Sequence, residues 1–365
     1  MISPQDFEHL VKHLAEAFRE AEIELLEKIA RTLDEGSDDP AIWQQQKLAD
    51  LQKNQAMINR ILKRLAELSD QEIAKIISQS YIGGLLSADS DLVDAGQDLL
   101  EETVDVDLDD VTDLDAVRMF GGTHTEALAV MIGEAQGLIH NELGQVFRSA
   151  NDKYRQIIAE TSRLAMMGVD TRRQATQKAI IKFASNGIVN FVDKRGRNWD
   201  IASYAEMATR ASTGNASIQG TLNRLQQQGY DLVIVSDHAE ECERCRPWER
   251  KVLSISGTSK RYKSVRDARS AGLFHPGCGH VLGAYFPGVT KPPRGRTADP
   301  QGYKQRQKQR ELERMVRKWK KREAISITEE EKTKSRAKVR EYQGKLREFT
   351  KETGRPRDYW REQIR

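Results

Sequence analysis

Hydrophobic positions in the first half of the chain recur with the 3.6-residue period of an amphipathic helix. This repeat predicts helices over residues 4–34, 41–68, 71–82, 123–165 and 171–186. Gly36 and Pro40 interrupt the first pair, and Ser69-Asp70-Gln71-Glu72 offers the start of the third helix. The N-terminal half is therefore expected to be α-helical.

The pattern changes after residue 186. The apolar runs 188–192 and 199–201 flank a polar turn that contains Gly196, which is typical of a β-hairpin. Two short helices, near 202–212 and 216–228, are predicted next. The run Asp231-Leu-Val-Ile-Val-Ser236 then has the composition of a buried strand. We interpret residues 187–288 as a small α+β domain.

Residues after the Pro- and Gly-rich stretch 287–295 return to a helical pattern up to Arg365. Their apolar stripes are narrow: Leu312, Met315, Val316 and Trp319 in one helix, and Val339, Tyr342, Leu346 and Phe349 in the next. Stripes this thin cannot support a domain alone, so we expect them to pack on a partner or on the rest of the chain. Trp319 is interpreted as an anchor in a helix interface.

Charge is unevenly distributed along the 365 residues, although the net charge is only +3. Residues 1–115 carry 27 acidic against 10 basic side chains, and residues 291–365 carry 25 basic against 12 acidic. Such a chain is suited to bridging unlike partners. The acidic stretch 83–117 lacks the spacing of a calcium-binding loop and is interpreted as a flexible or partner-ordered connection.

The N-terminus lacks the pattern of a secretory signal, and no apolar run approaches the 18 residues of a membrane span. All three cysteines and three of the seven histidines lie between residues 238 and 280. Cys242 and Cys245 have CxxC spacing, and His275 and Cys278 have HxxC spacing, with His280 as a substitute for His275. Two such turns can present ligands to one tetrahedral ion, and thiolates with imidazole favour Zn(II).

A structural zinc site is therefore predicted, in a reducing compartment. Two alternatives remain open: a metal-free hydrogen-bonded cluster, and a catalytic metal centre with His238 or Glu249 as base. No phosphate-binding loop or nucleophile elbow is present, so we expect no enzyme activity. The predicted fold class is mainly α with a small α+β zinc-knuckle domain, and long helical segments at both ends. The predicted divisions are 1–117, 118–186, 187–288 and 289–365.

The basic C-terminal segment is predicted to contact nucleic acid through sequence-independent phosphate contacts. The residues assigned to this contact are Lys304, Arg306, Lys308, Arg310, Arg314, Arg317, Lys318, Lys320, Lys321 and Arg322.

The cysteine-containing segment resembles the phage minor capsid protein 2 family, a relative of the Mu-type minor head proteins. The similarity is carried by Asp237-His238, the run Cys242–Gly257, Phe274–His280 and Tyr285–Gly288, and in the tail by Tyr303, 305–321, Tyr342-Gln343, Tyr359 and Arg361-Glu362. At the position of Gly279, many relatives carry a basic residue instead. The tail lacks the toxin enzyme of some Mu-type relatives, so that activity is not carried over.

The resemblance implies a minor head protein of a tailed bacteriophage, present in few copies inside the head near the portal vertex. Its implied partners are the portal, the major capsid or scaffold proteins and packaged DNA, with no membrane and no small-molecule substrate. Its implied roles are head morphogenesis and DNA packaging or ejection, in the virion after assembly in the host cytoplasm. The alternatives are a metal-dependent nuclease or phage-delivered effector enzyme, and a zinc-containing nucleic-acid-binding module.

Overall fold

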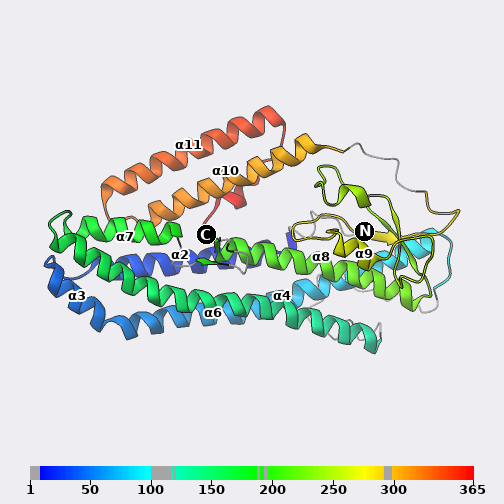
Figure 1. Ribbon diagram of the computed structural model, residues 1–365, viewed down its shortest axis with the longest axis horizontal. Coiled ribbons are helices and arrows are strands. Elements are labelled where there is room, and N and C mark those ends of the chain that lie inside the picture. The colour runs from blue at the N-terminus through cyan, green and yellow to red at the C-terminus, as the bar shows by residue number, and fades with distance from the viewer. Residues whose placement is uncertain are drawn as a thin grey trace. The chain divides into compact units, whose positions relative to one another are not determined.

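The computed structural model describes residues 9–99, 117, 121–186, 190–192, 196, 198–291 and 298–365. Most of these residues are helical (Figure 1). Internal contacts group the chain into two units. Unit 1 comprises residues 1–13, 69–138 and 206–304, and unit 2 comprises residues 14–68, 139–205 and 305–365. The acidic stretch 100–116 lies outside the described residues.

The described α-helices are, in chain order, α2 (Lys12–Asp34), α3 (Pro40–Ala49), α4 (Leu51–Asp94), α6 (Gly122–Met166), α7 (Arg172–Asn186), α8 (Ile201–Gln227), α9 (Val265–Ser270), α10 (Pro300–Ala324) and α11 (Glu329–Thr353). The strands are β1 (Asn190–Val192), β2 (Asn198–Asp200), β3 (Leu232–Val235), β4 (Val252–Ser254) and β5 (Leu282–Ala284). Short 3-10 helices are η2 (Arg246–Trp248) and η3 (Tyr359–Glu362).

The predicted helices over 123–165 and 171–186 are confirmed as α6 and α7, and the predicted hairpin as the antiparallel pair β1–β2. Two predicted breaks are wrong. Helix α4 continues through Ser69, and α8 continues through residues 213–215. Ser69 is fully buried, and the Thr213 hydroxyl donates to the Thr209 carbonyl at 2.7 Å. A hydroxyl that bonds to the preceding turn stays within a helix instead of capping a new one.

The sheet of unit 1 has the order β4-β3-β5, and both pairings are antiparallel. Its apolar side chains pack with the end of α4 and the second half of α8 in one buried cluster. Leu92 of α4 and Leu225 of α8 are completely buried there, as are Val233 and Val235 of β3. The Asp91 carboxylate also accepts the Ala284 backbone N–H at 2.8 Å, which fixes the end of α4 to strand β5.

Helices α4 and α8 approach each other closely in unit 1. A Cβ added at Gly84 would lie 2.0 Å from the Ser217 carbonyl oxygen, and one added at Gly220 would lie 2.1 Å from the Tyr81 carbonyl oxygen. The Thr221 hydroxyl donates to the Gly84 carbonyl at 3.0 Å. Glycine is therefore required at both positions, since any side chain would push the two backbones apart.

Buried polar groups flank this crossing. The Arg224 guanidinium makes two hydrogen bonds with the Asp89 carboxylate, at 2.7 and 3.1 Å, and both side chains are almost inaccessible to solvent. The Tyr81 hydroxyl accepts from Asn223, the neighbour of Arg224, at 2.7 Å and contacts His124 at 3.0 Å. Removing either partner of the Arg224–Asp89 pair should lower the free energy of unfolding by about 3–5 kcal/mol, because the remaining buried charge is left without compensation.

Unit 2 is a helical assembly with its own core. Trp43 of α3 is completely buried, and its indole N–H donates to the Leu33 carbonyl at 3.1 Å. Arg172 at the start of α7 donates to the Asp34 carbonyl and to the Asp38 carboxylate. These contacts hold the α2–α3 turn against α7.

Helices α10 and α11 lie side by side in unit 2 and run in opposite directions (Figure 1). Ion pairs join them, at 2.6 Å between Arg322 and Glu331 and at 2.9 Å between Arg336 and Glu323. Both thin apolar stripes are buried within the chain, through Leu312 and Val316 in α10 and Val339 and Leu346 in α11. In α7, the Gln177 side-chain oxygen accepts the backbone N–H groups of residues 327 and 328, just before α11 begins.

Among the described helices, none combines the length and apolar character needed to cross a membrane.

Candidate functional site

The cysteine–histidine loops, residues 236–251 and 271–281, lie at one end of the three-stranded sheet. The first loop follows strand β3 and the second precedes strand β5. Since β3 and β5 are antiparallel neighbours with Val235 opposite Leu282, the end of one strand adjoins the start of the other. The topology therefore brings together two sequence motifs that are thirty residues apart.

Each loop contains a tight turn that sets the positions of its donors. The Cys242 carbonyl accepts the N–H groups of Cys245 and Arg246, both at 3.1 Å, and η2 begins directly afterwards. In the second loop, the His275 carbonyl accepts the Cys278 N–H at 2.8 Å. Turns of this kind place the first and fourth side chains on the same side, as a tetrahedral metal site requires.

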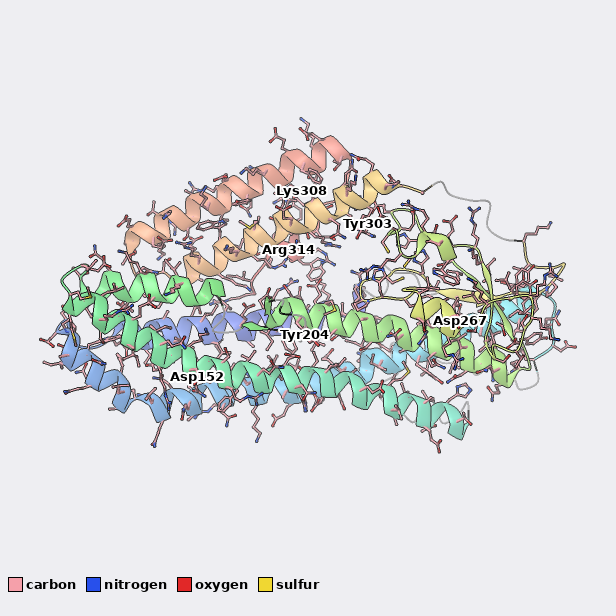
Figure 2. All side chains as sticks on the ribbon, in the orientation of Figure 1. Asp152, Tyr204, Asp267, Tyr303, Lys308 and Arg314 are labelled. Carbon is pink, nitrogen blue, oxygen red and sulfur yellow. The ribbon has the colours of Figure 1, made fainter. Side chains whose placement is uncertain are left out.

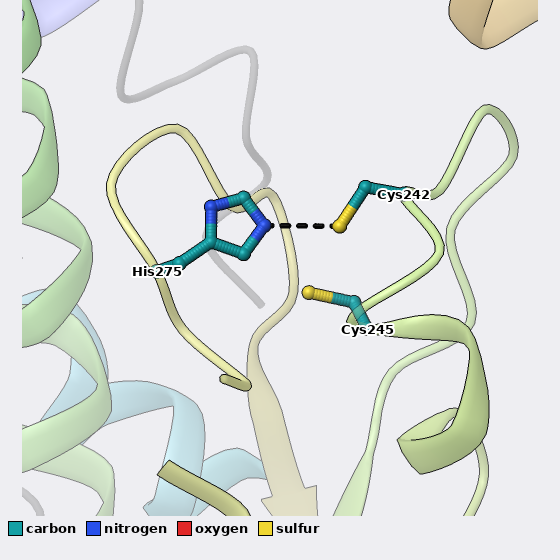
Figure 3. A group of neighbouring side chains, drawn as sticks. All are labelled: Cys242, Cys245 and His275. Carbon is teal, nitrogen blue, oxygen red and sulfur yellow. Dashed lines mark hydrogen bonds between the residues drawn. The ribbon is translucent and has the colours of Figure 1, made fainter. Parts of the chain in front are cut away.

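All five predicted metal ligands are found in this one cluster. Cys242 Sγ lies 3.0 Å from His275 Nε2, Cys245 Sγ lies 3.5 Å from Cys278 Sγ, and Cys278 Sγ lies 3.4 Å from His280 Nδ1. Figure 3 shows Cys242 and Cys245 facing His275 from opposite loops.

The donors fall into two groups of three with a shared member. Cys242, Cys245 and His275 form one group, and Cys245, Cys278 and His280 form the other; within each group the ligand atoms lie within 4.8 Å of one another. Two ligands of one tetrahedral zinc ion lie about 3.5–3.8 Å apart, given Zn–S and Zn–N bonds of about 2.3 and 2.0 Å. The donors therefore fit a metal ion of this type, with Cys245 at the centre of the set.

Each histidine uses its second ring nitrogen for an orienting contact. His280 Nε2 lies 2.8 Å from a Glu249 carboxylate oxygen, and that oxygen also accepts the His238 backbone N–H at 3.1 Å. His275 Nδ1 lies 2.9 Å from the Pro276 carbonyl oxygen. Histidines that bind metals commonly hold such a partner, because it fixes the tautomer and the ring orientation.

Backbone strain is concentrated in the same loops. In the described part of the chain, the non-glycine residues with positive φ are Glu240, Arg250 and Phe274. Each lies within two residues of a cluster member or of Glu249. Such conformations cost about 1–3 kcal/mol each and persist only where the surroundings enforce them.

The thiols have strongly perturbed acidity. The hydrogen bond from Cys245 is the main cause that lowers the pKa of the Cys278 thiol, to about 4, and His280 adds to it against the opposing effect of burial. The same contact with Cys278, together with burial, raises the pKa of Cys245. For Cys242 burial acts to raise the pKa, but the His275 hydrogen bond and neighbouring donors outweigh it and lower the pKa. Thiolates are the forms that bind metals.

The residues considered as catalytic bases have other contacts. Glu249 bonds to His280, and Arg250 lies 3.9 Å from Asp237. The His238 ring contacts the carbonyl of Ala239 and lies 5.7 Å from the His280 ring. From the sequence, Glu249 could be identified only as an acidic residue near the CxxC motif, because its position depends on the turn at η2.

The ten predicted nucleic-acid contacts on α10 differ in their exposure to solvent. Lys304, Lys308, Arg314 and Lys318 are exposed; Figure 2 labels Lys308 and Arg314 on this helix. Arg306, Arg310, Arg317, Lys320, Lys321 and Arg322 are half-buried. Several of these half-buried residues have partners within the chain: Arg310 with Glu313, Lys320 with Gln363, Lys321 with Glu22, and Arg322 with Glu331.

Comparison with known proteins gives one family and one curated relative. The profile of the family described as "Phage minor capsid protein 2" matches residues 2–351. A protein named "Structural protein" from Lactococcus phage LL-H is 26% identical over 215 residues, which cover 54% of this chain and 58% of that protein. The match thus spans just over half of the relative's length. No solved structure matches the chain.

Proposed function

We infer the role of this protein from one premise: the chain belongs to the phage minor capsid protein 2 family. It is a structural protein of a bacteriophage, as is the relative from Lactococcus phage LL-H by its name. We propose that it is a low-copy component inside the head, near the portal vertex, that acts in head morphogenesis and in DNA packaging or ejection. The observation that carries this proposal is the family match over residues 2–351.

Quantitative mass spectrometry of purified, intact particles tests this role, with the portal protein as the internal standard. We expect the chain at a copy number comparable to or below that of the portal. Its presence only in infected-cell lysate, with none in particles, would contradict the proposal and favour an assembly factor or an effector enzyme.

We propose that the exposed face of α10 contacts packaged DNA without sequence preference. The exposed cations at positions 304, 308, 314 and 318 lie within about one third of the helix circumference, because a helix turns roughly 100° per residue. Glu311 shares this face and pairs with Lys308 at 3.0 Å, so Arg314 and Lys318 are expected to contribute most. The half-buried cations have partners inside the chain and contribute less.

A paired-variant experiment on the full chain tests this face. Arg314→Gln with Lys318→Gln should weaken binding to duplex DNA and reduce the slope of log affinity against log salt by about 1–2, since each phosphate contact contributes about 0.9. The control is Arg340→Gln with Arg347→Gln, which removes the same charge from exposed positions of α11. Equal losses of DNA affinity in the two double variants would contradict a role specific to α10. Unchanged affinity in the α10 double variant would favour the cysteine–histidine loops as the DNA-binding region.

We propose that the cysteine–histidine cluster holds a structural Zn(II) ion. The donor spacing, the orienting partners of both histidines and the low pKa of Cys278 support this assignment. A closed site would contribute folding energy to a domain whose sheet has strands of only three and four residues. Metal analysis of the purified chain should give one zinc per molecule, and Cys242→Ser should lower both metal content and thermal stability.

The same cluster allows a test of the enzyme alternative. A metal-dependent nuclease would cleave DNA as the purified protein and lose this activity in His280→Ala. We expect no cleavage, because four protein ligands leave no open position for water or substrate on a tetrahedral ion.

A further inference from the structure

Unit 1 carries a basic surface beside strand β4, distinct from the residues assigned to DNA on α10. Residues 250–266 contain six basic side chains and no acidic one, and all six are exposed to solvent. This set, the β4 surface, comprises Arg250, Lys251, Lys260, Arg261, Lys263 and Arg266. We propose that the β4 surface binds the phosphate backbone of duplex DNA, as a second contact independent of α10.

The fold brings the two ends of this segment together. The backbone N–H of Ser254 in β4 donates to the Lys263 carbonyl at 2.9 Å, and Ser254 also forms a parallel bridge with Ser264. Lys251 directly precedes β4, whereas Lys263 belongs to the segment that returns alongside this strand. Basic residues from two separate parts of the sequence therefore meet beside one strand.

Trp248 holds two of these cations near each other. Lys251 Nζ lies 5.7 Å from the centre of the Trp248 ring, and Lys263 Nζ lies 5.6 Å from it. An ammonium group within about 6 Å of an indole ring centre is attracted to the ring. Trp248 is packed in the buried cluster of unit 1, so its position limits where both charges can lie. The two ammonium groups are at most two such distances apart.

Most cations of the β4 surface have no acidic partner within the chain. In the part of the chain that the structure describes, five of the six form no ion pair, and Arg250 lies 3.9 Å from an Asp237 oxygen. Asp267, which follows the segment, accepts the Ser264 backbone N–H at 3.2 Å and caps α9. Exposed like charges without acidic partners create a positive potential that attracts a polyanion.

The geometry favours DNA over an acidic protein as this polyanion. Arg261 lies over the Tyr262 ring at 5.3 Å, and Tyr262 contacts Tyr285 edge-on at 6.4 Å, so aromatic rings hold cations at two places on the surface. An acidic protein would need a carboxylate matched to each cation. A duplex presents a phosphate about every 3.4 Å along each strand, so cations of irregular spacing all find partners. The choice of DNA rests on the proposed location inside the head.

The experiment measures the affinity of the full chain for a short duplex of mixed sequence over a range of salt concentrations. Lys251→Gln with Lys263→Gln should weaken binding by about 10–100-fold at about 0.1 M salt, and should reduce the slope of log affinity against log salt by about 1–2, since each phosphate contact contributes about 0.9. Lys251→Arg with Lys263→Arg should retain the wild-type affinity and slope, which separates lost charge from disturbed packing around Trp248.

Two further double variants serve as comparisons. The control is again Arg340→Gln with Arg347→Gln on α11, and an equal loss there would overturn the proposal, because net charge alone would then explain the effect. The glutamine changes in the β4 surface should add to those at Arg314 and Lys318. A combined variant that binds as well as the α10 double variant would overturn the second contact.

Other outcomes separate this proposal from the role in the head. Wild-type DNA affinity and slope in the β4 glutamine variant would overturn the proposal, and if that variant is also lost from particles, the surface binds an acidic protein instead. A wild-type chain without affinity for the duplex would overturn both DNA contacts. These measurements use purified chain and DNA, so their outcome is independent of whether mass spectrometry finds the chain in particles.

Discussion

The cysteine–histidine loops carry a dense set of metal-binding side chains, and helix α10 carries a dense set of basic ones. The first set is brought together in space, and the second is only partly exposed. In the loops, two turns bring all five donors into a single cluster around Cys245. In α10, four of the ten basic side chains are exposed and six are half-buried, and Lys321 and Arg322 among the half-buried ones bond within unit 2. A turn fixes where its side chains lie, whereas a helix distributes its side chains around an axis, so the packing of one face decides which remain available.

Charged groups also have different roles in the two regions. In the loops, burial and hydrogen bonds change the acidity of the thiols toward metal binding. In α10, Lys321 is 2.6 Å from the carboxylate of Glu22, which is 2% exposed on α2, so this charge serves a contact inside the chain. The count of basic residues in a sequence therefore overstates the charge that a helix can offer to a partner.

The largest effect is expected from the residue that both donor groups share. Cys245→Ser removes the only donor common to the two groups, so bound zinc should fall below detection and the sheet of unit 1 should unfold at a lower temperature. Metal analysis with thermal unfolding measures this, and Ser270→Ala, a change at an exposed position at the end of α9, is the control. Retention of zinc by the Cys245 variant would show that the loops do not form one site.

An intermediate effect is expected inside α10. At pH 8, where the Glu22 carboxylate is mostly ionised, Lys321→Met leaves a buried charge without its partner. Because this carboxylate can take up a proton instead, the free energy of unfolding should fall by about 3 kcal/mol, the lower end of the range for a broken buried pair. Lys318→Met, three residues earlier on the exposed face, should stay within about 0.5 kcal/mol of the wild type. Denaturant unfolding of both variants measures the difference. Equal stabilities would show that the Lys321–Glu22 contact adds nothing to stability.

The smallest effect is a pH dependence at the same contact. Burial raises the pKa of Glu22 from 4.5 to about 7, and the Lys321 contact offsets this only in part. Between these values the folded chain retains a proton that the unfolded chain has lost, so stability should fall as pH rises through this range. The wild type should lose about 2 kcal/mol more than Glu22→Gln between pH 5 and pH 8. Parallel pH profiles of the two proteins would show that Glu22 is already ionised when folded.

Periodicity was sufficient to predict the helices α6 and α7, the hairpin β1–β2 and the helical C-terminal segment. It failed at Ser69, where a helix start was inferred from residue identity although the side chain is buried within α4. It also failed near residue 214, where the Thr213 hydroxyl bonds to the preceding turn and α8 continues. Spacing predicted the members of the metal cluster, but not the role of Glu249. That role depends on contacts between loops that are far apart in sequence.

The two glycines at the α4–α8 crossing bear on how the chain is made. The hydrogen bond between Thr221 and Gly84 joins residues 137 positions apart, so this contact cannot form until the ribosome has released α8. Until then, the apolar face of α4 that later packs on α8 has no intramolecular cover, and contacts of such long sequence separation form slowly. During synthesis, unit 1 therefore passes through a stage in which chaperones or neighbouring chains can reach that face. A nascent chain stalled before residue 201 should be captured by holdases more strongly than one stalled after residue 290.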